Sequence, residues 1–188
     1  VRLTGKVAQG YRAPNLAELA KDGTFSNGTE LHNPNLEAEK SLTGEIGVDF
    51  DRGHWGTGLS AYYTDIDDIV GRTLTTPGTP GTDAVYTRDN QGKVVITGLE
   101  WVYRHRLGEG SSPYSVLADA TWTQGRQYDT TVDAGTGTQP LYDVPWRRVP
   151  PLFASVALDW RPREHTGTIG WAALRLRVAA PQDDLYPD

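Results

Sequence analysis

The sequence predicts an all-β protein, an antiparallel transmembrane β-barrel of which these residues form roughly seven strands. Two observations lead to this fold class. Apolar and polar side chains alternate along nearly every segment between turn residues, which is typical of strands with one wet face. Short and long connections also alternate along the chain, and outer-membrane barrels have short turns at one rim and long loops at the other.

Seven apolar stripes carry the alternation, and every second residue of a segment belongs to its stripe. In chain order the segments are residues 1–7, 42–50, 55–63, 97–103, 114–122, 152–160 and 174–178. The residues between the stripe positions are mostly polar, such as Arg2 in the first segment and Arg175 in the last. Each segment is therefore expected to form one strand of an antiparallel sheet.

The connections between these segments differ in length in a regular order. Short links are predicted at residues 51–54, 107–113 and 162–167, and long ones at residues 13–40, 73–85 and 129–148. Inside the first long link, Asn15 and the acidic Glu18 suit the start of a short helical turn over residues 15–21, which Gly23 ends.

Aromatic side chains fall near both ends of the predicted strands. Those near the short turns are Phe50, Trp55, Tyr103, Tyr114 and Trp160, and those near the long loops are Tyr63, Trp122 and Tyr128. Such rings form girdles at the headgroup level of outer-membrane barrels. They would equally suit the core of a soluble β-sandwich, and periodicity alone does not separate the two folds. The alternating connection lengths favour the barrel.

Composition excludes several classes of function. A net charge of −6 argues against a phosphate-backbone binder, so nucleic acid is not an expected partner. No apolar run approaches the roughly 20 residues of a membrane-spanning helix. The chain has no Cys for a disulfide or a thiolate metal site. No nucleophile elbow, phosphate-binding loop or metalloprotease pair occurs, so no enzyme, catalytic residue, metal or cofactor is expected.

Two proline-containing segments flank the first long link. They read Tyr11-Arg12-Ala13-Pro14 and Asn33-Pro34-Asn35-Leu36-Glu37-Ala38-Glu39. Their order and spacing resemble the strand-exit and strand-entry boxes of TonB-dependent outer-membrane receptors. Later strands of that family are similar, in the same order, to residues 41–48, 62–70, 98–100 and 148–151. The likeness therefore covers nearly the whole chain.

The resemblance implies a barrel of about twenty-two strands that encloses an N-terminal plug domain. A short segment ahead of the plug would engage TonB, and the receptor would lie in the lipid bilayer of a bacterial outer membrane. It would take up a scarce ligand such as a ferric siderophore, haem or cobalamin. Neither plug nor TonB segment is recognisable, and seven strands leave two unpaired edges, so residues 1–188 are expected to be a fragment of the barrel domain. The alternatives are a soluble β-sandwich binding module and a structural outer-membrane barrel without TonB coupling.

Ligands of such receptors meet the external loops and the upper lumen. Aromatic and basic groups there suit an anionic iron chelate through stacking and charge-assisted contacts. The candidates of this type are Tyr11, Arg12, Phe25, Tyr142, Trp146, Arg147 and Arg148. The alternative for Arg12 and Arg148 is an ion pair with a lumen carboxylate such as Glu45 or Asp119, because barrel interiors are generally polar.

His32 is a further candidate, because haem receptors of this family place an axial His between the two boxes. His32 lies between them but directly precedes Asn33, whereas the axial His usually stands further from the second box. A loop His without a ligand role is the alternative. The group Asp65, Asp67 and Asp68 lacks the Gly and the distal Glu of a calcium-binding loop, so a solvated strand end is expected there.

Overall fold

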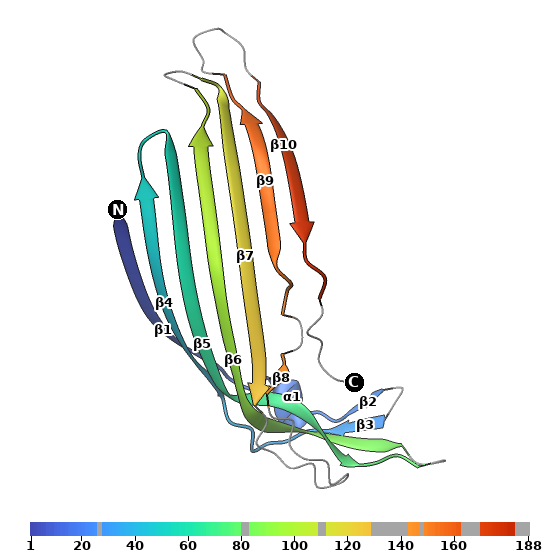
Figure 1. Cartoon of the computed structure of the whole chain (residues 1–188). Coiled ribbons are helices and arrows are strands. Elements are labelled where there is room, and N and C mark those ends of the chain that lie inside the picture. The colour runs from blue at the N-terminus through green and yellow to red at the C-terminus, as the bar shows by residue number, and fades with distance from the viewer. Residues whose placement is uncertain are drawn as a thin grey trace.

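The computed structural model describes residues 1–25, 28–79, 83–108, 112–128, 143–146, 149–162 and 170–182. Nearly all of its regular structure is β-strand (Figure 1). The elements are β1 (Arg2–Arg12), α1 (Leu16–Ala20), β2 (Gly23–Phe25), β3 (Gly28–Leu31), β4 (Glu39–Asp51), β5 (Trp55–Thr76), β6 (Ala84–Arg106), β7 (Tyr114–Tyr128), β8 (Val144–Pro145), β9 (Phe153–Trp160) and β10 (Ala172–Ala179). Within the described ranges, no helix is long and apolar enough to cross a bilayer.

Seven long strands form one antiparallel sheet in the order β1-β4-β5-β6-β7-β9-β10. They stand side by side in a curved arc, with β1 and β10 at its two edges (Figure 1). Each predicted stripe corresponds to one of these strands, so the seven predicted strands and their order are confirmed, whereas the short strands β2, β3 and β8 were not predicted. The short connection between Arg106 and Tyr114 is also where the sequence predicts it.

Strand register gathers the predicted stripes on one face of the sheet. One row across it consists of Leu3, Val48, Leu59, Trp101, Ala120, Ala154 and Val178, each paired with the next. The larger side chains of this row are exposed, and Ile46 in the neighbouring row is 70% exposed. Removal of apolar surface from water is the main stabilising contribution to folding, and this face has no protein layer over it in the described residues. The face therefore requires contact with an apolar environment.

The opposite face is polar, and ion pairs connect its strands. Arg2 binds Asp49 at 2.8 Å, and Lys6 lies 3.9 Å from Glu45. Farther along, the Tyr62 ring crosses Gly98 so that its hydroxyl lies 2.9 Å from the Thr123 hydroxyl. A Cβ at residue 98 would come within 2.4 Å of that ring, so glycine is what allows the tyrosine to bridge three strands.

The apolar face ends at a charged row near the long loops. Lys40, Asp67 and Lys93 pair in register on β4, β5 and β6 and form this charged row. Asp65 of the neighbouring row lies against Lys93. The rows between these charges and the short turns are here called the apolar band. The predicted aromatic side chains lie at its two ends, apart from Tyr128, which pairs with Lys93 in the charged row.

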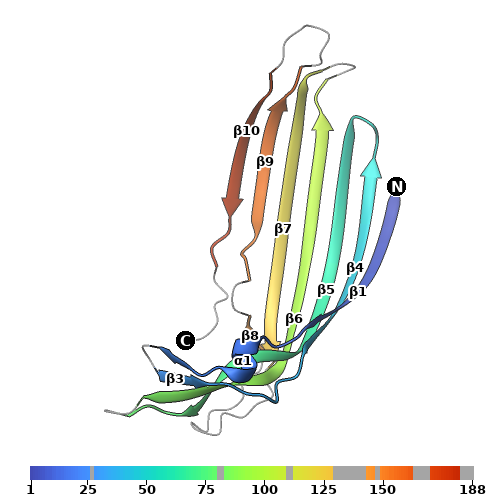
Figure 2. The ribbon, with the colours of Figure 1, turned by 180° about the vertical axis from the view of Figure 1, so that it is seen from behind.

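β5 and β6 extend into the predicted loop at residues 73–85, so the connection lies inside the predicted range but is shorter than predicted. Thr73 pairs with Thr87 and Leu74 with Tyr86, so the ladder continues to Thr76. Two neighbours stabilise this extension. β3 pairs in parallel with the outer part of β6, and β2 pairs with β3. The extension bends away from the main sheet in both views (Figures 1 and 2).

Most of the small core lies at this long-loop end. Leu36, Ile69, Val70 and Val94 are buried, and Val94 is fully inaccessible. The predicted helical turn is confirmed as α1, which lies at the same end as β2, β3 and β8 (Figure 2). Its N-cap Asn15 accepts from the Glu18 backbone N–H, and the Glu18 carboxylate accepts from Asn15, which forms a capping box.

Candidate ligand-binding surface

Arg12 of the first box is held by two carboxylates. Its guanidinium donates to both carboxylate oxygens of Glu39, at 2.7 and 2.6 Å, and lies 3.4 Å from Glu18 of α1. Glu39 also accepts from the Val70 backbone N–H at 2.9 Å. We call Arg12, Glu18 and Glu39 the Arg12 cluster, and it joins β1, α1, β4 and β5.

The second box is fastened to the β5–β6 extension by asparagine side chains. Asn33 donates to the Arg88 carbonyl at 2.9 Å. Asn90 accepts from the Glu37 backbone N–H at 2.8 Å and donates to the carbonyl of Asp68 at 2.7 Å. The two boxes therefore fold the first long link back onto the sheet, and this fixes where β2 and β3 lie.

A basic and aromatic group lies on the extension. Arg72 and Arg88 pair in register, and one carboxylate, Glu30 of β3, binds both through separate oxygens at 2.7 Å. The Arg72 guanidinium lies 4.5 Å from the Phe25 ring centroid and 5.5 Å from that of Tyr86. We call these five residues the Arg72 cluster. Two cations share one anion, so the cluster keeps one positive charge.

Glu30 of the Arg72 cluster and Glu39 of the Arg12 cluster stay ionised at neutral pH. Burial alone would raise the pKa of Glu30, but the hydrogen bond and charge of Arg88, together with Arg72, hold it below its ordinary value. Burial likewise opposes ionisation of Glu39, and the Arg12 hydrogen bond and the Val70 N–H outweigh it, so the pKa of Glu39 is lowered. Both groups lie outside the apolar band.

The predicted site residues do not gather at one place. Tyr11 follows the register of the apolar face and pairs with Lys40, whereas Arg12 lies on the polar face. The predicted alternative for Arg12, an ion pair with a carboxylate, is what the structure has, but with Glu39 and Glu18 in place of Glu45 or Asp119.

Two further candidates have identified neighbours. His32 Nδ1 lies 2.7 Å from Asp22 Oδ1, which also accepts from the His32 backbone N–H. These contacts lower the pKa of Asp22, the backbone hydrogen bond most of all. The Trp146 backbone N–H donates to the Gly125 carbonyl at 2.8 Å. Tyr142, Arg147 and Arg148 lie outside the described residues. No group of three or more acidic or histidine side chains is placed to hold a metal ion within the described ranges.

Sequence reasoning missed most of the Arg72 cluster, although Phe25 was a candidate. Arg72 and Arg88 are joined by Glu30, which lies more than 40 positions away in the chain. The usable signal was the polar stretch between Asp65 and Asn90, where charges occur on strand residues of both faces. From the sequence alone this polar stretch is expected to be a loop, because the parallel pairing of β3 with β6 has no local signal.

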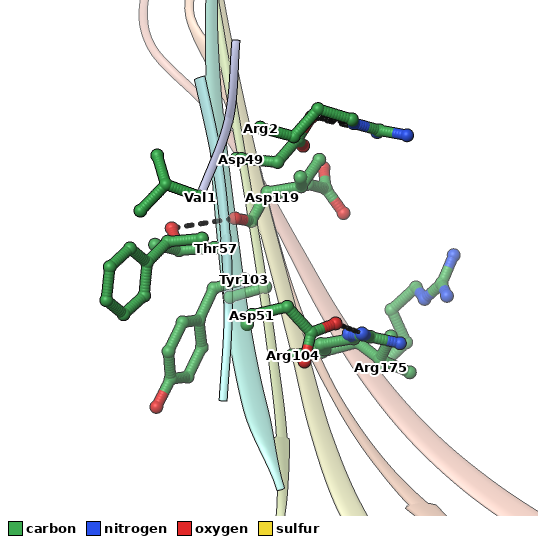
Figure 3. Close-up of a pocket in the computed structure, with 15 residues that line it drawn as sticks. Val1, Arg2, Asp49, Asp51, Thr57, Tyr103, Arg104, Asp119 and Arg175 are labelled. Carbon is green, nitrogen blue, oxygen red and sulfur yellow. Dashed lines mark hydrogen bonds and ion pairs between the residues drawn. The ribbon is translucent and has the colours of Figure 1, made fainter. Parts of the chain in front are cut away.

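A hollow lies at the other end of the sheet, near the short turns (Figure 3). Arg2, Asp49, Asp51, Arg104, Asp119 and Arg175 extend to one side of the strands there, and Val1, Thr57 and Tyr103 extend to the other (Figure 3). None of the predicted ligand-binding residues lines it. The picture shows the separation of polar and apolar faces at the level of single side chains.

The amino-acid sequence matches known receptors. The family model described as TonB dependent receptor-like, beta-barrel matches residues 1–188. The chain is 26% identical over 177 residues to the ferric enterobactin receptor PirA of Pseudomonas aeruginosa, covering 86% of this chain and 22% of that protein. It is also 26% identical over 171 residues to the ferrienterobactin receptor of Escherichia coli K12, covering 84% of this chain and 21% of that protein. The chain thus spans about a fifth of the length of these relatives.

Solved structures show the same fold. The copper transporter OprC superposes with a TM-score of 0.64 at 19% identity, over 99% of this chain and 25% of that one. The siderophore receptor PirA of Pseudomonas aeruginosa gives 0.61 at 22% identity, over 84% of this chain and 28% of that one. The sheet is thus part of an antiparallel barrel, and the chain belongs to the TonB-dependent receptor family, within its β-barrel domain.

Proposed function

We propose that this chain is part of the barrel of an outer-membrane transporter that takes up a ferric siderophore with energy supplied through TonB. The family match over residues 1–188 carries the proposal. The named relatives are receptors for ferric enterobactin, which supports a siderophore over haem or cobalamin. In this proposal the plug domain and the TonB-contacting segment belong to the longer protein, and this chain is only barrel.

The charge and shape of the long-loop end support an anionic ligand. The Arg72 cluster carries one surplus positive charge beside two aromatic rings, and such groups bind anionic, ring-containing chelates by charge and stacking. Arg12 contributes indirectly in this account, because its two carboxylate partners leave it a positioning role for α1 and the first loop. Tyr11, His32, Tyr142, Trp146, Arg147 and Arg148 remain candidates for contact with the ligand.

Uptake by the full-length receptor tests this proposal. The gene is expressed in an iron-starved strain that lacks its own siderophore receptors, with and without functional TonB, and cell-associated ⁵⁵Fe from ferric enterobactin is measured. We expect TonB-dependent accumulation, and an Arg72→Gln with Arg88→Gln variant should bind less of the chelate at equal surface expression. Growth on haem or uptake of labelled cobalamin, without accumulation of ⁵⁵Fe from ferric siderophores, would overturn the ligand class.

A further inference from the structure

The short-turn end of the apolar face carries a group of neighbouring rings together with one guanidinium. The Arg52 guanidinium lies 4.9 Å from the Phe50 ring centroid, and Phe50 stacks on Trp55 at 5.3 Å. The rings of His54 and His105 lie 5.9 Å apart, and the Tyr103 hydroxyl is 3.0 Å from His105 Nδ1. We call these six residues the rim cluster.

Strand register places the rim cluster at the edge of the apolar band. Phe50 and Tyr103 share one row with Thr57, and Trp55 pairs directly with His105 in the next row. Tyr103 points to the apolar side of the sheet, away from Arg104 and Asp51 (Figure 3). Amphipathic rings in such a position meet lipid headgroups, so the guanidinium and imidazoles beside them lie at phosphate level.

The guanidinium and the two imidazoles of the rim cluster lack anionic partners among the described residues. Among the residues that the structure describes, no carboxylate pairs with Arg52, His54 or His105. The nearest acid in the chain, Asp51, is already engaged by the Gly53 backbone N–H at 2.8 Å and by the Arg104 guanidinium. A guanidinium beside two imidazoles at an apolar boundary leaves several N–H donors for an oxyanion.

The opposite edge of the band has the contrary arrangement. Lys93 lies against Asp65, and Lys40 lies 3.1 Å from Asp68 and 3.8 Å from Glu37. The cations there are neutralised within the protein, and acidic groups outnumber them. The two edges are therefore unequal as sites for a phosphate, and only the rim cluster offers unneutralised positive charge.

We infer that the rim cluster binds the phosphate of an anionic glycerophospholipid in the leaflet at the short-turn end. Arg52 and His54 would bind the phosphate oxygens, His105 would be oriented by Tyr103, and Phe50 and Trp55 would contact the glycerol and first acyl carbons. A free phosphate lacks the acyl chains that the apolar band would hold beside these rings, so a lipid is the occupant. The inference depends on the barrel fold and not on the transported ligand.

Native mass spectrometry of the full-length receptor tests it. The purified protein is titrated with dioleoyl phosphatidylglycerol and, separately, with the zwitterionic dioleoyl phosphatidylcholine, and retained lipids are counted. We expect preferential retention of phosphatidylglycerol, weakened about tenfold by Arg52→Gln with His54→Gln, which removes the positive charge of Arg52 and the imidazole of His54. Arg52→Lys should keep most of the affinity because it keeps the charge. Inorganic phosphate at millimolar concentration should not displace the lipid.

The matched control removes two cations at the other edge of the band. Lys40→Gln with Lys93→Gln should leave phosphatidylglycerol retention unchanged, because both lysines are already paired. Heat-modified electrophoretic mobility of each variant verifies that the barrel is folded before binding is compared. Equal retention of the two lipids by the unmodified receptor, undiminished retention by the Arg52 and His54 variant, or an equal loss in the lysine control would each overturn the inference. Siderophore uptake is measured separately, so failure of one proposal is distinguishable from failure of the other.

Discussion

The two ends of the sheet use charge in different ways. At the long-loop end, Glu30 lies between two arginines, and Glu39 binds Arg12 and the Val70 backbone N–H, so both carboxylates join segments far apart in the chain. At the short-turn end, Arg2 and Asp49 pair across adjacent strands with side chains 75% and 41% exposed, and Arg52 has an aromatic ring as its neighbour. Ion pairs therefore hold loops in place at the long-loop end, whereas at the short-turn end Arg52 has no anionic partner among the described residues.

Lowering the pH should produce the largest difference in stability between the two ends of the sheet. The pKa values of Glu30 and Glu39 are lowered by folding, so their contribution is present above the ordinary carboxyl pKa of about 4.3 and is lost as pH falls through the lowered values. We expect β2 and β3 to detach below about pH 4 while the main sheet persists. A ¹⁹F label at Thr24 reports detachment, and a second label at Thr57 should not change. Simultaneous changes of both labels would contradict the comparison.

Removing the central carboxylate of the Arg12 cluster should have the largest effect of any single substitution. Glu39→Ala leaves Arg12 and the Val70 N–H without their main acceptor, at a cost of about 2 kcal/mol in the stability of the folded loop. Asp49→Ala, the matched change at the short-turn end, should cost less than about 1 kcal/mol because that pair is exposed. Hydrogen exchange of α1 amides measures the difference, and equal effects would refute it.

Glu30→Gln should have a smaller, more local effect. The substitution leaves Arg72 and Arg88, which pair directly across β5 and β6, without their shared anion and should destabilise the β3 pairing by about 1 kcal/mol. Faster exchange of β3 amides is the expected result, with β7 amides unchanged. Glu37→Gln is the control, since that carboxylate is 72% exposed and 3.8 Å from Lys40. The shared-anion account fails if the control loosens β3 to the same degree.

The exposed lysine pairs should matter least for stability. Lys40→Gln removes contacts with Asp68 and Glu37, and exposed pairs of this kind contribute little to stability. Urea midpoints of the unmodified receptor and the variant, compared at low and high salt, should differ slightly at low salt and coincide at high salt. A large difference that survives high salt would show that this edge is structurally as important as the Arg12 cluster.

The alternation of side chains made the main sheet predictable. Each outward side chain from Leu3 to Val178 must suit an apolar environment, so the strands can be recognised one at a time. The β5–β6 extension was not predictable in this way, because its faces meet polar loop segments and leave no apolar stripe. Arg12 illustrates the same limit for the site. Its pairing with Glu39 depends on the register of β1 against β4, which no local pattern encodes.

The most direct test of the account is the position of the apolar band in a bilayer. Single spin labels replace Leu59 and Asp65 in the full-length receptor reconstituted in lipid. Both residues follow the same face of β5, Leu59 inside the band and Asp65 beside the charged row. Accessibility to oxygen and to a water-soluble nickel chelate is then measured for each. We predict that the label at residue 59 meets oxygen and is shielded from the chelate, and that the label at residue 65 shows the reverse. Free access of the chelate to residue 59 would contradict a lipid-facing apolar band.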